Sequence, residues 1–249
     1  MRSMNHQVVL LLTGCVQPNI KNDVLAIKDV ETRKNQYLEA IDWYIKNTPY
    51  KIVFCENSGY DLKSEMAIRG RQIEYLSFVA SSYGADRGKG YKEMEILEYI
   101  HEHSKFYREG DLFVKVTGRL ILLNICQIIK HLDKYTCEFV SSYIYGRRVF
   151  SDSRFIFFTQ KYFPLLLAQK ENITDWRHNF EYFTFVSVME AKKQGIKFIY
   201  PPMLESVHGI GGGLGVSYDL SNKEYFKKNL RHQIKRLLFG LGVLPRVKR

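Results

Sequence analysis

Two cations flank a tight turn at the end of an apolar segment. Residues 111–119 read Asp-Leu-Phe-Val-Lys-Val-Thr-Gly-Arg, so that Lys115 and Arg119 bracket Thr117 and Gly118. A diphosphate that departs as its bond breaks gains negative charge, which fixed cations stabilise. Arginine can also hold a phosphate through two parallel hydrogen bonds. The alternative is a pair of strand-end charges that face water; we favour an anion-binding site formed by these four residues.

Polar residues also follow the first two predicted strands. The apolar run 8–12 leads into a Thr-Gly pair, and the run 51–55 leads into a Glu-Asn pair. Because the carboxyl ends of parallel strands meet at one edge of a sheet, where such sheets bind their ligands, we expect these residues near the cations. The residues expected at this ligand-binding edge are Thr13, Gly14, Glu56 and Asn57.

Two further basic residues are candidates for contact with a diphosphate. Arg33 lies one turn into the first predicted helix, and Lys89 lies in the glycine-rich loop 81–90. For each, an ordinary solvated position on a helix or loop is an equally good interpretation.

If the chain transfers a group to a hydroxyl of an acceptor molecule, with inversion at the reacting carbon, one carboxylate must take the proton of that hydroxyl. Asp152, between a short predicted strand and Arg154, is the first candidate for this base. Glu181, near the start of a predicted helix, is the second, and Asp175 is the third. A purely structural role is the alternative for each of them.

The alternation of predicted strands and helices in the first 135 residues indicates βαβ units and therefore an α/β fold with a mostly parallel central sheet flanked by helices. Apolar patterning predicts strands at Val8–Leu12, Lys51–Cys55, Ile73–Phe78, Asp111–Val116, Glu138–Tyr145, Arg148–Phe150, Arg154–Thr159 and Ile196–Tyr200. It predicts helices at Asp29–Lys46, Tyr91–Phe106, Leu120–Leu132, Gln160–Gln169 and Asn179–Gln194, with Asp29 as an N-cap. The glycine-rich loop 208–215 is interpreted either as a lid over the site or as a plain connection.

Composition limits the classes of protein to consider. The chain has 249 residues, of which 45% are hydrophobic and 25% charged, which excludes a wholly disordered chain. No uncharged apolar run reaches the roughly 18 residues of a membrane-spanning helix. The four cysteines lack zinc-site spacing, and neither the glycines at 209–215 nor Gly88-Lys89 fit a known nucleotide-binding motif.

Most of the net charge of +11 lies at the C-terminus. The segment 223–249 carries +8, and we expect residues 219–249 to form a basic amphipathic helix and tail after a domain at 1–218. The apolar residues that share one face of this helix are Leu230, Ile234, Leu237, Leu238 and Leu241. The helix has three interpretations, namely an element that binds an anionic membrane surface, a helix packed on the body, or a nucleic-acid arm. We favour the membrane surface.

The segment Leu12-Thr13-Gly14-Cys15 has a second interpretation, because it is similar to the cleavage box of a bacterial lipoprotein. The preceding apolar run of seven residues is at the short end for a signal peptide, so we favour a first strand. A basic nucleic-acid-binding protein is the alternative function. Its stacking platforms would need exposed aromatic residues, whereas most of those here alternate with apolar residues and are expected to be buried.

Five segments together resemble the bacterial glycosyltransferases of lipopolysaccharide O-antigen and capsule assembly. They are residues 29–37 (DVETRKNQY), 54–58 (FCENS), 89–93 (KGYKE), 114–119 (VKVTGR) and 151–154 (SDSR). Within that group we expect a galactosyl- or galactofuranosyltransferase. The resemblance implies a GT-A-like, Rossmann-type fold and transfer of a hexose from UDP-galactose or UDP-galactofuranose to a lipid-linked saccharide. It implies that the base or ribose of this nucleotide contacts Thr13, Gly14, Glu56 and Asn57. It also implies a cytoplasmic, peripheral position at the inner face of the bacterial plasma membrane, with no nucleic acid as partner.

This sequence departs from that group in one respect. GT-A enzymes carry an acidic D-x-D pair that holds Mg²⁺ or Mn²⁺ against the diphosphate, whereas the corresponding strand end here carries Lys115 and Arg119. The nearest substitute, Asp152-Ser-Arg154, is basic at its third position. We therefore expect no metal ligands and no divalent metal or other cofactor, with cations in place of the metal.

Overall fold

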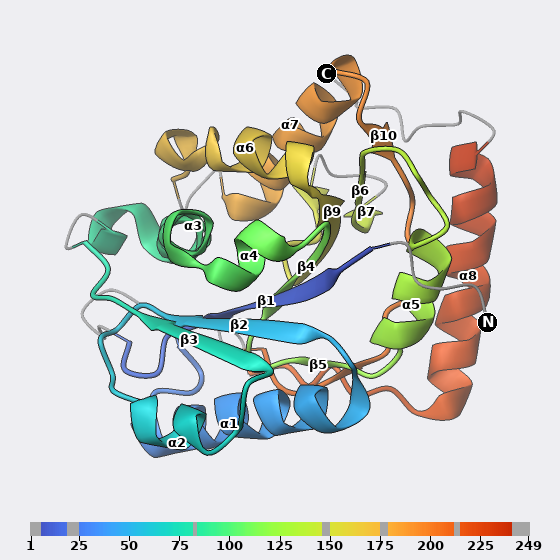
Figure 1. The fold of residues 1–249 in the computed structure, drawn as a ribbon. Coiled ribbons are helices and arrows are strands. Elements are labelled where there is room, and N and C mark those ends of the chain that lie inside the picture. Colours follow the sequence, from blue (N-terminus) through green and yellow to red (C-terminus); the bar gives the residue numbers. More distant parts are fainter. Residues whose placement is uncertain are drawn as a thin grey trace.

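A computed structural model describes residues 6–18, 25–81, 84–145, 150–174, 179–211 and 215–240 of the chain. Within these residues, seven strands form one central sheet in the order β3-β2-β1-β4-β9-β6-β10 (Figure 1). The strands are β1 (Val8–Gly14), β2 (Lys51–Glu56), β3 (Ile73–Ser77), β4 (Leu112–Thr117), β6 (Phe139–Ser141), β9 (Phe155–Thr159) and β10 (Lys197–Phe198). Neighbouring strands are parallel except at β9, which is antiparallel to both β4 and β6.

Strand β1 lies inside the sheet, between β2 and β4, and is buried along its whole length. Its side chains alternate between two apolar clusters, because successive residues of a strand point to opposite faces. Leu10 and Leu12 join one cluster, and Val9 and Leu11 join the other. A continuous apolar run is therefore what a parallel strand covered on both faces requires.

Helices cover both faces of the sheet (Figure 1). One face packs against α1 (Val30–Asn47), α2 (Lys63–Ala67) and α5 (Ile125–Leu132). The other packs against α3 (Gly84–His103), α4 (Lys105–Glu109), α6 (Phe163–Leu167) and α7 (Phe180–Lys193). The predicted fold class is thus confirmed as α/β, with a mostly parallel central sheet flanked by helices and a C-terminal helix, α8 (Asn222–Gly240).

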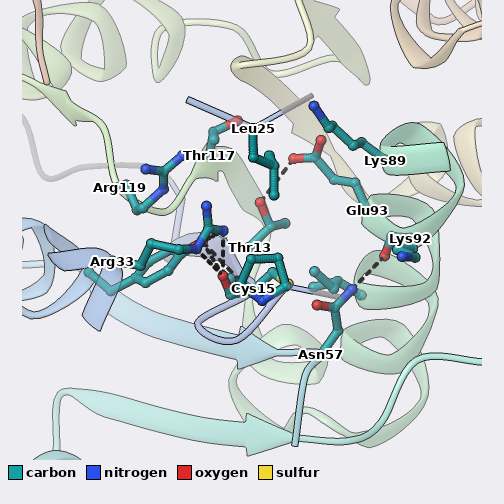
Figure 2. Close-up of a pocket in the computed structure, with 14 residues that line it drawn as sticks. Thr13, Cys15, Leu25, Arg33, Asn57, Lys89, Lys92, Glu93, Thr117 and Arg119 are labelled. Atoms are coloured by element: carbon teal, nitrogen blue, oxygen red, sulfur yellow. Dashed lines mark hydrogen bonds between the residues drawn. The ribbon is translucent and has the colours of Figure 1, made fainter. Parts of the chain in front are cut away.

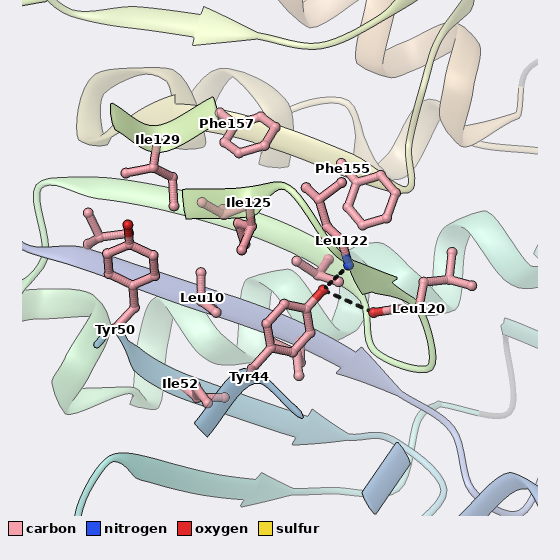
Figure 3. Close-up of a cluster of buried hydrophobic side chains, with 14 of the residues drawn as sticks. Leu10, Tyr44, Tyr50, Ile52, Leu120, Leu122, Ile125, Ile129, Phe155 and Phe157 are labelled. Atoms are coloured by element: carbon pink, nitrogen blue, oxygen red, sulfur yellow. Dashed lines mark hydrogen bonds between the residues drawn. The ribbon is translucent and has the colours of Figure 1, made fainter. Parts of the chain in front are cut away.

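Helix α1 begins where the sequence predicts. The carboxylate of Asp29 accepts a hydrogen bond from the backbone N–H of Thr32, which caps the helix. Further along, the buried hydroxyl of Tyr44 donates to the carbonyl of Leu120 at 3.0 Å and accepts from the N–H of Leu122 at 2.8 Å (Figure 3). Tyr44 thereby anchors the segment that leaves β4 to α1.

Several predicted boundaries are corrected by the structure. The expected helix over 120–132 begins only at Ile125, because Ile121–Leu122 forms the short strand β5, which pairs with β11 (Val207–His208). The expected strand over 138–145 is two strands, β6 and β7 (Ile144–Tyr145), and β7 pairs with β8 (Phe150–Ser151). The remaining short elements are two 3₁₀ turns, η1 (Gln160–Tyr162) and η2 (Lys170–Asn172). None of the described helices is both long and apolar enough to cross a lipid bilayer.

Candidate functional site

A cavity of about 230 Å³ lies at the carboxyl edge of the sheet (Figure 2). The chain runs from β1 outward to β2 and β3, then crosses to the other side of β1 to form β4. The cavity therefore lies where the strand order reverses, the point at which open α/β sheets bind ligands. Its lining residues are Thr13, Gly14, Cys15, Pro18, Leu25, Arg33, Tyr37, Asn57, Lys89, Lys92, Glu93, Ile96, Thr117 and Arg119.

The segment after β1 is held in place by helix α1. The guanidinium of Arg33 donates through Nε to the carbonyl of Cys15 at 2.9 Å and through Nη1 to the carbonyl of Ile27 at 3.2 Å. The hydroxyl of Tyr37 accepts from the N–H of Cys15 at 2.9 Å. Arg33 lines the cavity, as predicted of a residue near the ligand, but its nitrogens serve carbonyl groups of its own chain. We therefore interpret it as a residue that positions the wall rather than a ligand of phosphate.

At the end of β2, Asn57 and Glu56 differ in role. Asn57 lines the cavity and donates through Nδ2 to the carbonyl of Lys92, whereas its buried Oδ1 has no hydrogen-bond partner among the described residues. The carboxylate of Glu56 is fully buried and accepts from the N–H groups of Val16, Ser58 and Tyr60. Glu56 lies outside the cavity lining, so its position does not fit the predicted contact with base or ribose.

Helix α3 presents one face to the cavity. Gly88 interrupts the helix with φ +77° and ψ −167°, a conformation that residues with a side chain rarely adopt. Beyond this kink, Lys89, Lys92, Glu93 and Ile96 recur at helical spacing and all line the cavity. The predicted loop over 81–90 therefore ends in a helical turn that places two lysines and one carboxylate beside the strand ends.

Strand β4 ends at the opposite wall. Thr117 and Arg119 line the cavity, and Arg119 Nη1 donates to the side chain of Gln36 at 2.8 Å. Gly118 lies behind this wall, where its N–H donates to the carbonyl of Thr13 at 2.9 Å. A Cβ at Gly118 would lie 2.6 Å from that same carbonyl oxygen, so only glycine lets the ends of β1 and β4 approach so closely.

Lys115 does not line the cavity. Its side chain is fully buried, and its ammonium lies 2.5 Å from Glu93 Oε1 while also donating to Thr117 Oγ1 and to the carbonyl of Ser153. This position does not fit the predicted direct contact with a diphosphate. The physical reason is that Lys115 points to the sheet face covered by α3 and α7, where Phe180 packs over the ammonium at 5.4 Å.

The donor set at this edge does not fit a divalent cation. The end of β4 supplies an ammonium, a hydroxyl and a guanidinium, and the carboxylate of Glu93 is already paired with Lys115. In the part of the chain that the structure describes, no group of three or more His, Cys, Asp and Glu side chains is placed to hold a metal. The absence of a metal requirement stays a prediction.

Asp152, the first candidate base, lies outside the cavity lining in a buried polar cluster. Its carboxylate pairs with Arg154 at 2.5 Å and accepts from the hydroxyl of Tyr145 at 3.0 Å. Burial alone would raise the pKa of Asp152, but the ion pair with Arg154 holds it below its ordinary value. Burial, together with the negative charge of Asp152, raises the pKa of the neighbouring Glu205 to about 8.

Glu181 lies outside the cavity lining and is linked to Lys115 through Ser153. Its Oε1 accepts from the hydroxyl of Ser153 at 2.8 Å, and the carbonyl of Ser153 accepts from Lys115. Because Arg154, the next residue, gives its carbonyl to the N–H of Thr117, the segment 152–154 is tied to the cavity wall. Asp175, the third candidate base, lies outside the described residues.

The structure thus gathers most of the predicted ligand contacts at one place. The predicted residues that line the cavity are Thr13, Gly14, Arg33, Asn57, Lys89, Thr117 and Arg119. The predicted residues that do not line it are Glu56, Lys115, Gly118, Asp152 and Glu181. Sequence reasoning missed Lys92 and Glu93, although their spacing of three and four residues from Lys89 was a signal for a shared helix face.

No protein-family model matches the chain, and no curated protein matches its sequence. A solved structure from Desulfovibrio desulfuricans G20, provisionally described as a nucleotide-diphospho-sugar transferase, aligns at 10% identity and a TM-score of 0.48, over 78% of this chain and 79% of that one. The inositol-1-phosphate CTP transferase of T. maritima aligns at 11% identity and a TM-score of 0.46, over 94% of this chain and 97% of that one.

The bifunctional glycosyltransferase WbbM, in its apo structure, aligns at 13% identity and a TM-score of 0.48. The match covers 94% of this chain and 45% of that one, so this chain corresponds to less than half of that protein. Likenesses of such low identity and with TM-scores below 0.5 carry no argument about the reaction. The function is therefore argued from the residues of the cavity.

Proposed function

We propose that this chain is a glycosyltransferase that binds a nucleotide-diphosphate sugar in the cavity at the switch point of its sheet. The observation that carries the proposal is the convergence of three basic side chains on one cavity. Arg119 reaches it from the end of β4, and Lys89 and Lys92 reach it from α3. Cations from two elements around one cavity suit a polyanionic ligand such as a diphosphate.

The other walls of the cavity suit a nucleoside. Pro18, Leu25, Tyr37 and Ile96 supply apolar surface against which a base can pack. Asn57 Oδ1 is a buried acceptor without a partner among the described residues, and such an atom is costly unless a donor reaches it. An N–H of a base or a hydroxyl of a ribose would supply that donor.

In the proposed reaction the bond between the anomeric carbon and the diphosphate oxygen breaks as the acceptor oxygen bonds to that carbon. The cations of the cavity stabilise the charge that develops on the departing diphosphate. A carboxylate takes the proton of the acceptor hydroxyl, and Asp152 remains the first candidate, followed by Glu181. This scheme is inverting and uses no divalent metal.

The finer assignments rest on the sequence resemblance alone. They are a hexose donor, UDP-galactose or UDP-galactofuranose, and a lipid-linked saccharide acceptor used in the synthesis of O-antigen or capsule. This acceptor would place the enzyme at the cytoplasmic face of the bacterial plasma membrane.

Isothermal titration of the full chain with UDP and UDP-galactose, with and without EDTA, tests the proposal. We expect both ligands to bind in either condition. The variant Arg119→Ala should bind at least about tenfold more weakly, because a charge-assisted hydrogen bond is lost. The matched control Arg71→Ala removes an exposed arginine distant from the cavity lining and should bind normally.

Product analysis separates sugar transfer from nucleotidyl transfer. A glycosyltransferase releases UDP from UDP-galactose, whereas a nucleotidyltransferase forms or consumes pyrophosphate. Failure of both ligands to bind, or normal binding by Arg119→Ala, would refute the donor site. Loss of binding in EDTA alone would refute only the metal-independent form of the reaction.

A further inference from the structure

Helix α8 carries an exposed apolar stripe. Phe226, Leu230, Ile234, Leu237 and Leu238 follow one another at intervals of three or four residues, or side by side, and all five are exposed, Phe226 to 72% and Leu237 to 66%. The other large apolar side chains that are exposed among the described residues lie in other segments, at Ile68, Val79, Leu123, Tyr145, Ile210 and Val216. Contiguous apolar surface of this kind marks an interaction site.

The opposite face of α8 packs on the body. The imidazole of His232 contacts the carbonyl of Pro201 at 2.8 Å, Asn229 accepts from the N–H of Leu204, and Tyr225 donates to the carbonyl of Leu204. Phe239 packs against Phe198 and Tyr200. The helix is therefore fixed to the body through polar and aromatic contacts, and it lies beside the body in Figure 1. Its apolar stripe is left exposed.

Basic residues accompany the stripe. Within Asn222–Gly240, six lysines and arginines stand against one acid, Glu224. At helical spacing Lys223 and Lys227 lie on the stripe or at its margin, and Arg231 follows on the same flank. All three are exposed.

The combination of an exposed apolar stripe with basic residues distinguishes between possible binding partners of α8. A nucleic acid is matched by the cations but leaves five apolar side chains in water. A second copy of the chain would cover the stripe but would bring two strongly basic helices together. An anionic bilayer accepts both components, because the apolar side chains enter the acyl boundary while the cations contact headgroup phosphates.

We propose that α8 docks this chain on an anionic lipid bilayer, with Phe226, Leu230, Ile234, Leu237 and Leu238 inserted at the interface and Lys223, Lys227 and Arg231 against the headgroups. The proposal goes beyond the donor reaction and does not depend on it. Because the stripe is already exposed while the opposite face of α8 packs on the body, docking requires no rearrangement of the domain.

Co-sedimentation of the full chain with vesicles tests it. We expect binding to vesicles of phosphatidylcholine and phosphatidylglycerol in equal parts, little binding to phosphatidylcholine alone, and weaker binding as salt rises. The double variant Leu230→Ser/Leu237→Ser should bind at least about tenfold more weakly, because two side chains lose their burial in the interface. Lys227→Glu/Arg231→Glu should lose the preference for anionic vesicles.

Matched controls come from other parts of the surface. Ile68→Ser changes a side chain that is 83% exposed at the C-terminal end of α2, and Lys192→Glu changes an exposed lysine of α7. Both should bind vesicles as the parent chain does. Circular dichroism should show all variants folded, since the altered side chains are exposed.

Three outcomes would overturn the proposal. The first is an absence of binding to anionic vesicles by the folded parent chain. The second is a dimer in sedimentation equilibrium that the two leucine substitutions dissociate. The third is salt-sensitive binding to single-stranded RNA that exceeds vesicle binding and survives the loss of both leucines.

Discussion

The ammonium of Lys115 lies 2.5 Å from Glu93 Oε1, and this ion pair joins a fully buried side chain of β4 to one that lines the cavity. The hydroxyl of Thr13 donates to the same carboxylate oxygen at 2.9 Å. Among the described residues that line the cavity, Glu93 is the one carboxylate, and it is held from two sides. Lys115 therefore shapes the cavity indirectly, by fixing the position of Glu93.

The variant Lys115→Met tests this relationship. It keeps an unbranched apolar side chain but leaves the Glu93 carboxylate without its counterion. We expect the free energy of unfolding to fall by up to about 3 kcal/mol, discounted from a fully buried pair because Glu93 is partly exposed. Denaturant titration measures this loss, and titration with UDP should show weaker binding.

A double-mutant cycle supplies the control. Glu93→Gln in the Lys115→Met background removes the uncompensated charge, so part of the lost stability should return. Lys192→Met, at an exposed site, should leave stability and UDP binding unchanged. If Lys115→Met is as stable as the parent chain, the ion pair does not hold Glu93.

Asn57→Ala separates ligand binding from stability. Because Asn57 Oδ1 has no partner among the described residues, its removal relieves a buried unpaired acceptor and offsets the loss of the long 3.3 Å bond to Lys92. We expect a change in unfolding free energy within about 1 kcal/mol but a loss of roughly tenfold or more in UDP affinity.

Calorimetry of UDP binding and denaturant titration on the same samples check this expectation. Asn172→Ala, at an exposed position, is the matched control and should alter neither quantity. Unchanged UDP affinity in Asn57→Ala would show that Oδ1 does not contact the nucleotide.

The edge of the sheet could be predicted from the sequence, because the carboxyl ends of parallel strands must lie together. Apolar runs that end in polar residues place Thr13, Asn57 and Thr117 at one edge. Helical spacing after Gly88 also places Lys89 beside Glu93. These relations depend on local periodicity, which the sequence displays directly.

The roles of Lys115, Glu56 and Arg33 could not be predicted in the same way. Alternation along β4 puts Lys115 on the same face of the sheet as Phe113. Only the tertiary structure shows that α3 and α7 cover this face at the position of Lys115 and bury its side chain. Glu56 and Arg33 likewise form hydrogen bonds with the backbone. The carboxylate of Glu56 accepts from the N–H of Val16, and the guanidinium of Arg33 donates to the carbonyl of Cys15. The type of a residue shows that its side chain is charged. The hydrogen-bond partners of that side chain depend on the conformation of loops, which sequence periodicity does not predict.

The variant Gly118→Ala tests the close approach of β1 and β4. Its Cβ would lie 2.6 Å from the carbonyl oxygen of Thr13, a backbone atom that can move only with the strand. We expect a destabilisation of about 1–3 kcal/mol and weaker UDP binding, since both cavity walls must shift. Thermal unfolding and calorimetry measure the two effects.

Gly195→Ala provides the comparison for Gly118→Ala. Gly195 has φ +80° with nothing within 4 Å of an added Cβ, so the substitution costs stability through backbone strain alone. It should leave UDP affinity unchanged. Equal losses of affinity in both variants would indicate a general effect of lower stability rather than a local one at the cavity.

The raised pKa of the buried Glu205 carboxyl leads us to expect a specific dependence of the protein's stability on pH. Burial, and then the charge of Asp152, raises its pKa from 4.5 to about 8, while Arg154 acts in the opposite direction. Between these two values the unfolded chain has released the proton of Glu205 and the folded chain retains it, so stability falls as pH rises. Asp152 has a lowered pKa and acts in the opposite sense, but only in the acid range below this window.

Glu205→Gln removes this titration and keeps the shape of the side chain. As pH rises from about 5 to about 8, the parent chain should lose stability through Glu205 and the variant should not. The free energy of unfolding of the variant, relative to that of the parent chain, should therefore increase by a few kcal/mol, as an order of magnitude. Denaturant titrations of both proteins across this range measure the difference. Glu190→Gln, on the surface of α7, should follow the parent profile, because the pKa of Glu190 is lowered by its bonds to Gln194 and Lys193 and titrates below the window. Parallel profiles for Glu205→Gln and the parent chain would mean that Glu205 is ionised in the folded protein, with a counterion that neutralises it.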